Sequence, residues 1–437
     1  MYRYVRLPPS MSRWSIAILV SAAIAISYLD RQTLPWAINA IKADIPISNQ
    51  LKAALDTAFL ITYGLMYLGG GRLMDRLGTR RGFLIIMLFW SLACASHGIA
   101  RGVVMLAASR LLLGAGEGGG FPAATRAVAE WFPVNERATA MGIINGGTAV
   151  GAVVAPPLIA LVLTRVAWLG LAPWRWVFFL TGALGAIWTF WWWRSYDAPA
   201  PRQWPTGDTR HAPADGLPAS PNGRRARIPM AALLAHREVW GVIVAKFLSD
   251  AAWYFYLFWL PKFLFDAWHF DIKSASSVGW IPYAASGVGC LVGGGLSSRL
   301  LDRGYSVNAA RKTALGLSAA LMPWVMLVPA MSSVAWVIVI FSLAFFGQQS
   351  WSTLIMILPT DLIPTRAVGT VAGLVGLGGA MGGVVLGQLA GWLLDHGFSY
   401  TPVLVIAGSL HVIAFTIICI TIRTLDPLTF PQAPAHS

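Results

Sequence analysis

The sequence predicts an all-α polytopic membrane protein in which twelve transmembrane helices form two pseudo-symmetric bundles of six. Of the 437 residues, 57% are hydrophobic and only 11% are charged, whereas about a quarter of an average soluble protein is charged. Continuous apolar runs recur along the chain, and a run of about 20 residues is long enough to cross a hydrocarbon core of ~30 Å. A polar segment near the middle divides these runs into two groups.

The two groups of apolar runs define the predicted spans and domains. The first group covers residues 13–38, 53–72, 82–99, 103–125, 138–163 and 174–195, and the second covers 239–265, 276–299, 312–331, 334–358, 367–393 and 401–423. The segment between them is rich in Pro, Gly, Ala and Arg, a composition typical of a flexible, solvated linker. We therefore expect an N-terminal bundle over residues 1–195, a linker over 196–238 and a C-terminal bundle over 239–437.

The distribution of positive charge predicts the orientation. The formal net charge is +14, which in a soluble protein would suggest nucleic acid. Here arginines cluster before the first span, between the second and third spans, in the linker and between the eighth and ninth spans. Because positive residues accumulate in cytoplasmic loops, both termini and the linker are predicted to be cytoplasmic, in a multi-pass protein of the cell's inner (plasma) membrane. No nucleic-acid partner is expected, and the three scattered cysteines suggest neither a disulfide framework nor a metal site.

Four ionisable residues stand out inside the predicted spans: Asp30, Arg31, Arg110 and Glu117. A charge at a helix centre costs about 2.5–3.5 kcal/mol on the insertion scale, so such residues are functional by default. Arg110 and Glu117 are two helical turns apart and share a face of the fourth span. Asp30 and Arg31 are neighbours and must point about 100° apart. One of them can face a central cavity while the other faces a neighbouring helix.

A polar turn follows the second span in the stretch GRLMDRLGTRR, residues 71–81. Glycines permit the tight reversal between two helices, and Asp75 can interact with a nearby arginine or with a helix N-terminus. The element Asp302-Arg303-Gly304 repeats this pattern at the equivalent place in the second half. A weak repeat between two six-span halves is typical of a transporter.

These motifs resemble those of the major facilitator superfamily, and the resemblance covers essentially the whole chain. The loop signature is carried by Gly71, Asp75, Arg76, Gly78 and Arg80, to which we assign structural and ion-pairing roles. The stretches YLDR (28–31), RLLLGAGEGGGFPAA (110–124) and AKFLSDAAWYFYLFWLPKFL (245–264) resemble the anion:cation symporter family, hexuronate and sugar-acid branch. The resemblance implies transport of organic anions, often with protons, and sugar acids such as glucuronate, galacturonate and galactonate are the typical substrates.

The charged residues support this interpretation. A substrate carboxylate needs a permanent cation with fork geometry, and Arg31 is our first candidate. Arg110 is either a second candidate or the structural ion-pair partner of Glu117 or Asp30. Proton coupling needs an acid that responds to burial and neighbouring charge, and the resemblance assigns that role to Asp30 and Glu117. The alternative is a buried charge network that only fixes helix packing.

Sugar hydroxyls need directional hydrogen-bonding groups at mid-membrane. Tyr63 matches a tyrosine that the sugar-acid carriers place in their cavity, and the further candidates are Asn145, Tyr254, Gln349 and Trp351. For each of them, packing or interhelical hydrogen bonding is an equally good explanation. Gly147 and Gly151 form a small-xxx-small pair, for which we favour gating contacts between the halves over plain packing. Lys246 and Asp250, four residues apart, are expected to neutralise each other.

We therefore expect a secondary active transporter that moves a sugar acid (hexuronate or aldonate) with protons by alternating access. It should act as a monomer in the lipid bilayer, with a small organic anion as substrate, protons as coupling ion and no other cofactor. One rival is a carrier of another carboxylate, such as phthalate or tartrate, or an organic-anion exporter. A polytopic membrane enzyme is disfavoured because the sequence offers no metal cluster, nucleophile–base pair or cofactor loop. A non-transporting sensor is disfavoured because the linker lacks a signalling domain.

Overall fold

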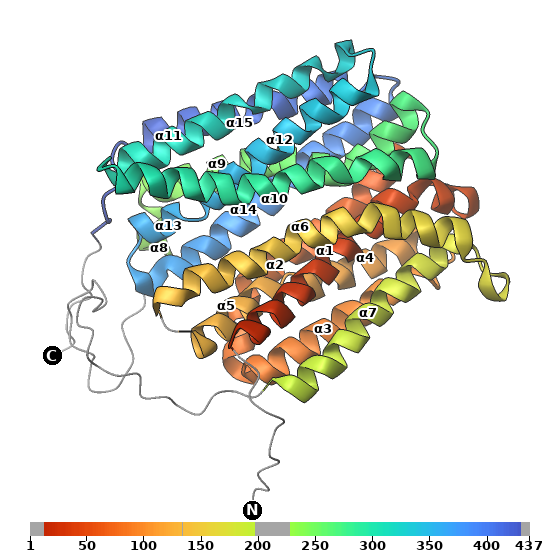
Figure 1. Cartoon of the computed structure of the whole chain (residues 1–437), viewed down its shortest axis with the longest axis horizontal. Helices are drawn as coiled ribbons and strands as arrows, with labels where there is room; N and C mark the ends of the chain where they lie inside the picture. The colour runs from red at the N-terminus through yellow and green to blue at the C-terminus, as the bar shows by residue number, and fades with distance from the viewer. Residues whose placement is uncertain (1–12, 133, 197–227, 430–437) are drawn as a thin grey trace, which may run out of the picture. The chain divides into compact units, whose positions relative to one another are not determined.

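The computed structural model describes residues 13–132, 134–196 and 228–429. At residues 71, 72, 75, 129, 134–139, 365 and 366 it describes the backbone alone. Every regular element in these ranges is a helix (Figure 1), as an all-α fold requires. Most of the predicted linker, residues 197–227, lies outside the described residues, so its character remains a prediction.

The helices follow the predicted spans closely. The first half contains α1 (Arg13–Asp44), α2 (Asn49–Leu77), α3 (Thr79–His97), α4 (Val103–Glu117), α5 (Gly120–Trp131), α6 (Val134–Arg165), the short η1 (Trp168–Gly170) and α7 (Pro173–Ser195). The second half contains α8 (Met230–Leu234), α9 (Arg237–Trp268), α10 (Ile272–Asp302), α11 (Val307–Ala320), η3 (Met322–Ala330), α12 (Val334–Ile355), α13 (Leu358–Leu362), α14 (Thr365–Asp395) and α15 (Thr401–Thr421). Two predicted spans are broken: the fourth into α4 and α5, and the ninth into α11 and η3.

Nine helical segments within the described ranges are long and apolar enough to cross a membrane. The fourth span is not among them, because α4 ends after 15 residues. It also carries Arg110 and Glu117, both charged, within that length. The interruption thus coincides with the charges that the sequence places inside this span.

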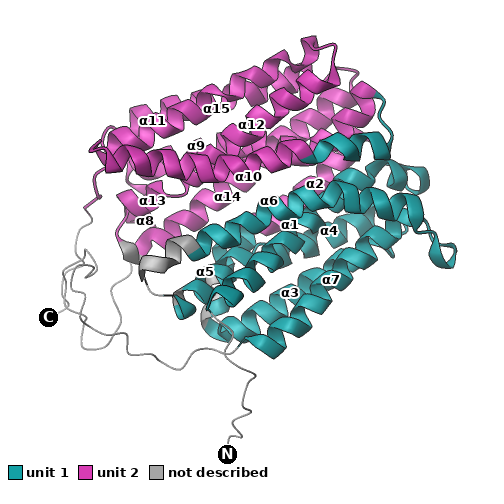
Figure 2. Ribbon diagram, in the orientation of Figure 1, with its two compact units in different colours: residues 1–47, 65–201, 269–280 teal, residues 48–64, 202–268, 281–437 magenta. Residues whose placement is uncertain are grey.

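The chain divides into two compact units whose boundaries differ from the predicted bundles (Figure 2). Unit 1 comprises residues 1–47, 65–201 and 269–280, and unit 2 comprises residues 48–64, 202–268 and 281–437. The beginning of α2 therefore belongs to unit 2, and the beginning of α10 belongs to unit 1. Sequence position alone did not indicate either exchange.

The packing within each unit repeats. In unit 1, α1 packs against α6 and α7, and α3 packs against α4 and α7. In unit 2, α9 packs against α14 and α15, and η3 packs against α12 and α15. Because the first, third, fourth, fifth and sixth spans of each half pair in the same way, the two halves share one architecture.

Glycines allow the closest of these helix pairs to form. A Cβ atom added to Gly151 on α6 would lie 2.1 Å from the backbone oxygen of Ala25 on α1, and one added to Gly147 would lie 2.3 Å from that of Ser21. On α14, a Cβ atom at Gly382 would lie 1.8 Å from the backbone oxygen of Phe247 on α9. These glycines pack within their own unit, so the prediction that Gly147 and Gly151 make gating contacts between the halves is wrong.

Gly151→Ala is expected to destabilise the protein, because a methyl group cannot occupy the space of the Ala25 carbonyl. Overpacking of this kind costs about 1–3 kcal/mol. Thermal unfolding in detergent should show the loss as a lower midpoint. Gly146→Ala, on the same helix with nothing within 4 Å of the added Cβ, is the matched control. Equal midpoints for the two variants would contradict the close α1–α6 contact.

A cluster around Glu130 ties together the ends of three helices in unit 1. Thr79 of α3 and Tyr196, which follows α7, donate to the Glu130 oxygens Oε1 and Oε2, each over 2.6 Å. Arg126 donates to Oε1 over 3.1 Å. Burial, together with the Glu130 carboxylate, raises the pKa of the Tyr196 phenol above its usual value, so the phenol remains a donor.

Candidate functional site

Arg31 and Glu117 form a buried ion pair between α1 and α4. The guanidinium Nε of Arg31 donates to Glu117 Oε2 over 2.6 Å, and Ser27 Oγ donates to the same oxygen over 2.7 Å. Both charged residues are 2% exposed. The structure therefore brings together the predicted carboxylate-binding arginine and one of the two predicted proton-carrying acids.

The break in the fourth span places Glu117 at the end of α4. Its second oxygen, Oε1, has no hydrogen-bond partner among the described residues. The glycines on either side bring α4 and α5 close to α3: a Cβ atom at Gly116 would lie 2.5 Å from Trp90, and one at Gly119 would lie 2.5 Å from Ile86. The position of the carboxylate is thus set by the end of α4, where Glu117 lies, and by the close packing of this region against α3.

Asp30 points away from this ion pair, toward α3 and α7. Its Oδ1 accepts a hydrogen bond from Cys94 Sγ over 3.4 Å, and that sulfur lies 3.2 Å from Thr181 Oγ1. Asp30 is fully buried, and its Oδ2 has no hydrogen-bond partner among the described residues. Of the two orientations that the sequence left open, the structure shows Arg31 facing the other charges and Asp30 facing neighbouring helices.

Arg110 completes a centre of two cations and two acids in unit 1. It is fully buried on α4 and interacts electrostatically with Glu117 and with His97. Asp30 and Glu117 also interact with each other. His97 stacks on Phe178 at 4.8 Å and contacts backbone oxygens of its own helix, as expected for a packing residue. We refer to Asp30, Arg31, Arg110 and Glu117 as the charged centre.

The predicted sugar-contacting residues are divided between the two units. Asn145 belongs to unit 1, is exposed on α6, and its backbone oxygen accepts from Thr148 over 2.7 Å. Tyr63 and Tyr254 belong to unit 2, where each is buried and stacks on a phenylalanine one turn away, Phe59 and Phe258. Their aromatic faces therefore already have packing partners.

The two candidates on α12 have different surroundings. Gln349 Oε1 lies 3.7 Å from Cys290 Sγ, which makes it a polar contact between α12 and α10. Trp351 is fully buried in the hydrophobic core of unit 2 and packs edge-on against His411 at 5.4 Å. That position is typical of a packing residue, so the contribution of Trp351 to a substrate site stays a prediction.

The loop-signature residues form the turn between α2 and α3. Gly78 alone separates the helices, with a φ of 73° that other residues rarely adopt. Gly304 has a φ of 87° at the matching place after α10. Arg80 donates to the backbone oxygen of Trp193 over 2.8 Å, and Arg76 is exposed. Gly71 lies within α2, and the side chain of Asp75 lies outside the described atoms.

Unit 2 contains a second buried ion pair. Lys246 Nζ lies 2.9 Å from Asp250 Oδ1 and 3.3 Å from Ser352 Oγ. The pair is that expected from the four-residue spacing. Three residues that contact the charged side chains belong to no motif recognised in the sequence: Ser27, Cys94 and Thr181. Ser27 could have been found, because it lies one turn before Arg31 on the same face, whereas no spacing links Cys94 or Thr181 to Asp30.

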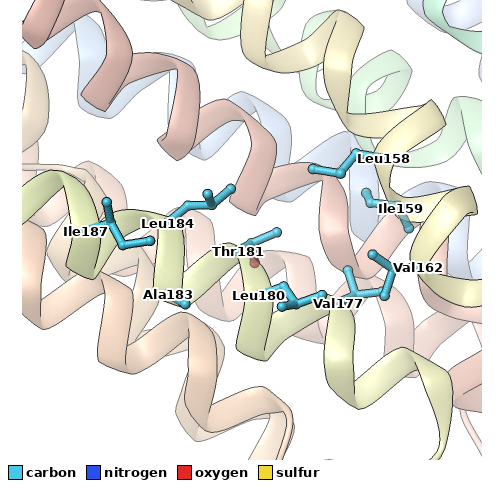
Figure 3. A pocket seen from close by; sticks show the side chains of 9 residues that line it. All are labelled: Leu158, Ile159, Val162, Val177, Leu180, Thr181, Ala183, Leu184 and Ile187. Atoms are coloured by element: carbon cyan, nitrogen blue, oxygen red, sulfur yellow. The ribbon is translucent and has the colours of Figure 1, made fainter. Parts of the chain in front are cut away.

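An apolar cavity of about 290 Å³ lies between α6 and α7 (Figure 3). Aliphatic side chains such as Leu158, Val177 and Ile187 line it, and Thr181 is the one hydroxyl-bearing residue among its lining residues. It offers no cation for an anionic ligand, so the charged centre is the better candidate for the functional site.

Comparison with known proteins identifies the family to which the chain belongs. The family description of the Major Facilitator Superfamily matches residues 20–387. The hexuronate transporter of Escherichia coli (strain K12) is 29% identical over 391 residues, 89% of each chain. The galacturonate transporter of Dickeya chrysanthemi is 31% identical over 314 residues, 71% of this chain and 89% of that protein.

The fold has a counterpart among solved structures. A bacterial homologue of the human lysosomal transporter Spinster, in an inward-facing and occupied conformation, matches with a TM-score of 0.73. The match covers 98% of this chain and 100% of the other at 17% identity, which supports the fold alone. The chain is therefore a multi-pass membrane transporter, not an enzyme, and belongs to the Major Facilitator Superfamily, in the branch of the hexuronate and galacturonate transporters.

Proposed function

We propose that the protein is a proton-coupled symporter of a sugar acid, a hexuronate or an aldonate, that works by alternating access. The observation that carries the proposal is the buried Arg31–Glu117 pair, with an Nε–Oε2 distance of 2.6 Å. A buried guanidinium that already binds one carboxylate has the geometry to bind another. The named activities of the two transporter relatives support a sugar acid as the substrate.

Competition for Arg31 would couple the proton to the substrate. While Glu117 is ionised, it occupies the Arg31 Nε, and a substrate carboxylate would have to displace it. Protonation of Glu117 would neutralise that acid and leave the guanidinium charge available for the substrate. Proton and substrate would therefore bind more favourably together than separately, as symport requires.

Asp30 would provide a second protonation site in the same centre. Its carboxyl group is enclosed by α3 and α7 and interacts electrostatically with Glu117. A change of charge on one acid therefore changes how readily the other binds a proton. A proton moved in excess of the substrate charge would add the membrane voltage to the driving force, about 2.3 kcal/mol per elementary charge per 100 mV. Both termini are proposed to be cytoplasmic, from the distribution of arginine.

Uptake into proteoliposomes tests the substrate class. Labelled glucuronate, galacturonate and galactonate are expected to accumulate when the outside is more acidic, and a protonophore should abolish the accumulation. Phthalate and tartrate, added as competitors, separate sugar acids from other carboxylates. Uptake of phthalate or tartrate but no sugar acid would move the substrate to that class, and the absence of counterflow for every organic anion tested would end the symport proposal.

A further inference from the structure

The beginning of α2 is held by the second half of the chain. Residues 48–64 belong to unit 2, whereas the rest of α2 belongs to unit 1 (Figure 2). Within unit 2, the backbone N–H groups of Asn49 and Gln50 donate to Asp395 Oδ1 and Oδ2, over 3.0 Å and 2.7 Å. Asp395 is the last residue of α14. A carboxylate from the end of one helix thus caps the start of another, 346 residues earlier.

This contact supplies hydrogen-bond acceptors and negative charge to the N-terminus of α2. The first four N–H groups of a helix have no partner within it, and the positive end of the helix dipole favours an anion. Asn49 is the first residue of α2. Ser48 supplies a local hydroxyl cap to Leu51 N over 3.1 Å. The two groups that Asp395 binds therefore depend on a distant residue, which is uncommon for a helix cap.

The contact continues along one face of α14. Gln388, about two turns before Asp395, donates to Thr57 Oγ1 over 2.7 Å and accepts from Gln50 Nε2. Between them lies Gly391, where an added Cβ would be 2.8 Å from Ala53 Cβ. Positions 388, 391 and 395 have the spacing of one helical face. They form a continuous strip, which we call the α14 strip, along the first turns of α2.

Another contact holds the same part of α2 to α9. Lys52 is fully buried, pairs with Asp56 over 2.7 Å and lies 4.2 Å from the ring centroid of Trp259. The first turns of α2 are therefore fixed both by α14 and by α9, two helices of the second half.

We propose that Asp395 is a latch that fastens the start of α2 to the second half in one state of the transport cycle and releases it in the other. The proposal rests on the alternating access of the proposed function, because α2 belongs to the first half by sequence while α9 and α14 belong to the second. Alternating access requires such contacts to open once in each cycle. Asp395 contacts none of the four residues of the charged centre. It would therefore affect the equilibrium between the two states of the cycle and not the affinity for substrate.

Accessibility of Ala53 tests the latch in the full chain. Ala53 is 1% exposed beneath the α14 strip, so an Ala53→Cys reporter should react slowly with a membrane-impermeant maleimide in proteoliposomes. Asparagine at position 395 loses the charge and one of the two accepting oxygens, and the loss of one such hydrogen bond shifts the equilibrium by about two- to tenfold. Asp395→Asn is therefore expected to raise the labelling rate within that range, and Asp395→Glu should restore a slow rate.

Two controls make the result specific. Asp271→Asn removes a local carboxylate contact, to Ser274 N over 2.9 Å, at the start of α10, and should leave labelling of the reporter unchanged. Cys94 is fully buried on α3, so it reports global unfolding. A rise at Cys94 as large as the rise at position 53 would make Asp395 a general stabilising residue and overturn the latch.

The labelling rate does not depend on which substrate is carried. If sugar-acid uptake is absent but Asp395→Asn still speeds the reporter, the latch stands and the proposed substrate fails. If Asp395→Asn leaves the labelling rate unchanged, the latch is wrong, whatever the transport assays show.

Discussion

Arg31→Ala is expected to abolish binding and uptake of the sugar acid. The substitution removes the guanidinium that would hold the substrate carboxylate, and it leaves Glu117 buried without its ionic partner. Loss of one member of a buried charge pair weakens an interaction by about 2–5 kcal/mol, which corresponds to a loss of affinity of at least about 30-fold. Equilibrium binding of a labelled sugar acid to the purified protein measures the effect directly.

Two further variants separate binding from stability. Arg31→Lys keeps the charge but loses the fork that fits a carboxylate, so an intermediate affinity is expected. Arg311 forms a comparable ion pair in unit 2, with its Nε 3.0 Å from Asp361 Oδ2. Arg311→Ala should lower the thermal midpoint while leaving affinity within a few-fold of the parent. Normal substrate affinity in Arg31→Ala would remove Arg31 from the site.

Glu117→Gln is expected to uncouple transport from protons while retaining exchange. Glutamine has the shape of a protonated glutamate and can still accept from Ser27 and Arg31, but it cannot release a proton. A gradient of one pH unit provides 1.36 kcal/mol per proton, or about tenfold accumulation for one coupled proton. Accumulation driven by the gradient should fall towards equilibration, whereas counterflow continues. The substrate affinity should depend less on pH than in the parent, because Asp30 is then the only acid left in the charged centre.

Glu130→Gln is the matched control for this uncoupling. Glu130 is hydrogen-bonded to Thr79 and Tyr196 and lies outside the charged centre, so the variant should still accumulate substrate along a pH gradient. Undiminished accumulation by Glu117→Gln would show that Glu117 does not carry the coupled proton. Asp30→Asn, measured in parallel, would then identify Asp30 as the carrier if it loses accumulation.

The sequence predicted the parts of the fold that depend on local pattern. Each span came from an apolar run, and the Lys246–Asp250 pair came from its helical spacing. The cost of isolated charge in lipid marked Arg31 and Glu117 as candidate site residues, although their pairing with each other was not predicted. These inferences need only short stretches of chain and a general physical rule.

The remaining features depend on contacts between distant segments. No spacing connects Cys94 with Asp30, 64 residues away, and nothing in the first half indicates that Asp395 contacts Asn49. Gly147 and Gly151 of α6 were recognised as a small-xxx-small pair, but their partner helix follows from the fold and not from the glycines. A twelve-span pattern therefore defines the architecture while leaving open which helix faces which.

The separation of Arg31 from Glu117 has a consequence for biosynthesis. The two residues are 86 positions apart, so α1 leaves the ribosome well before the carboxylate that neutralises its arginine has been made. Until α4 emerges, Arg31 lacks its ion-pair partner and only the adjacent Asp30 can offset its charge, which disfavours a location of the first span in lipid. Nascent chains truncated before Glu117 should therefore keep α1 extractable from the membrane, and chains that extend beyond α4 should not.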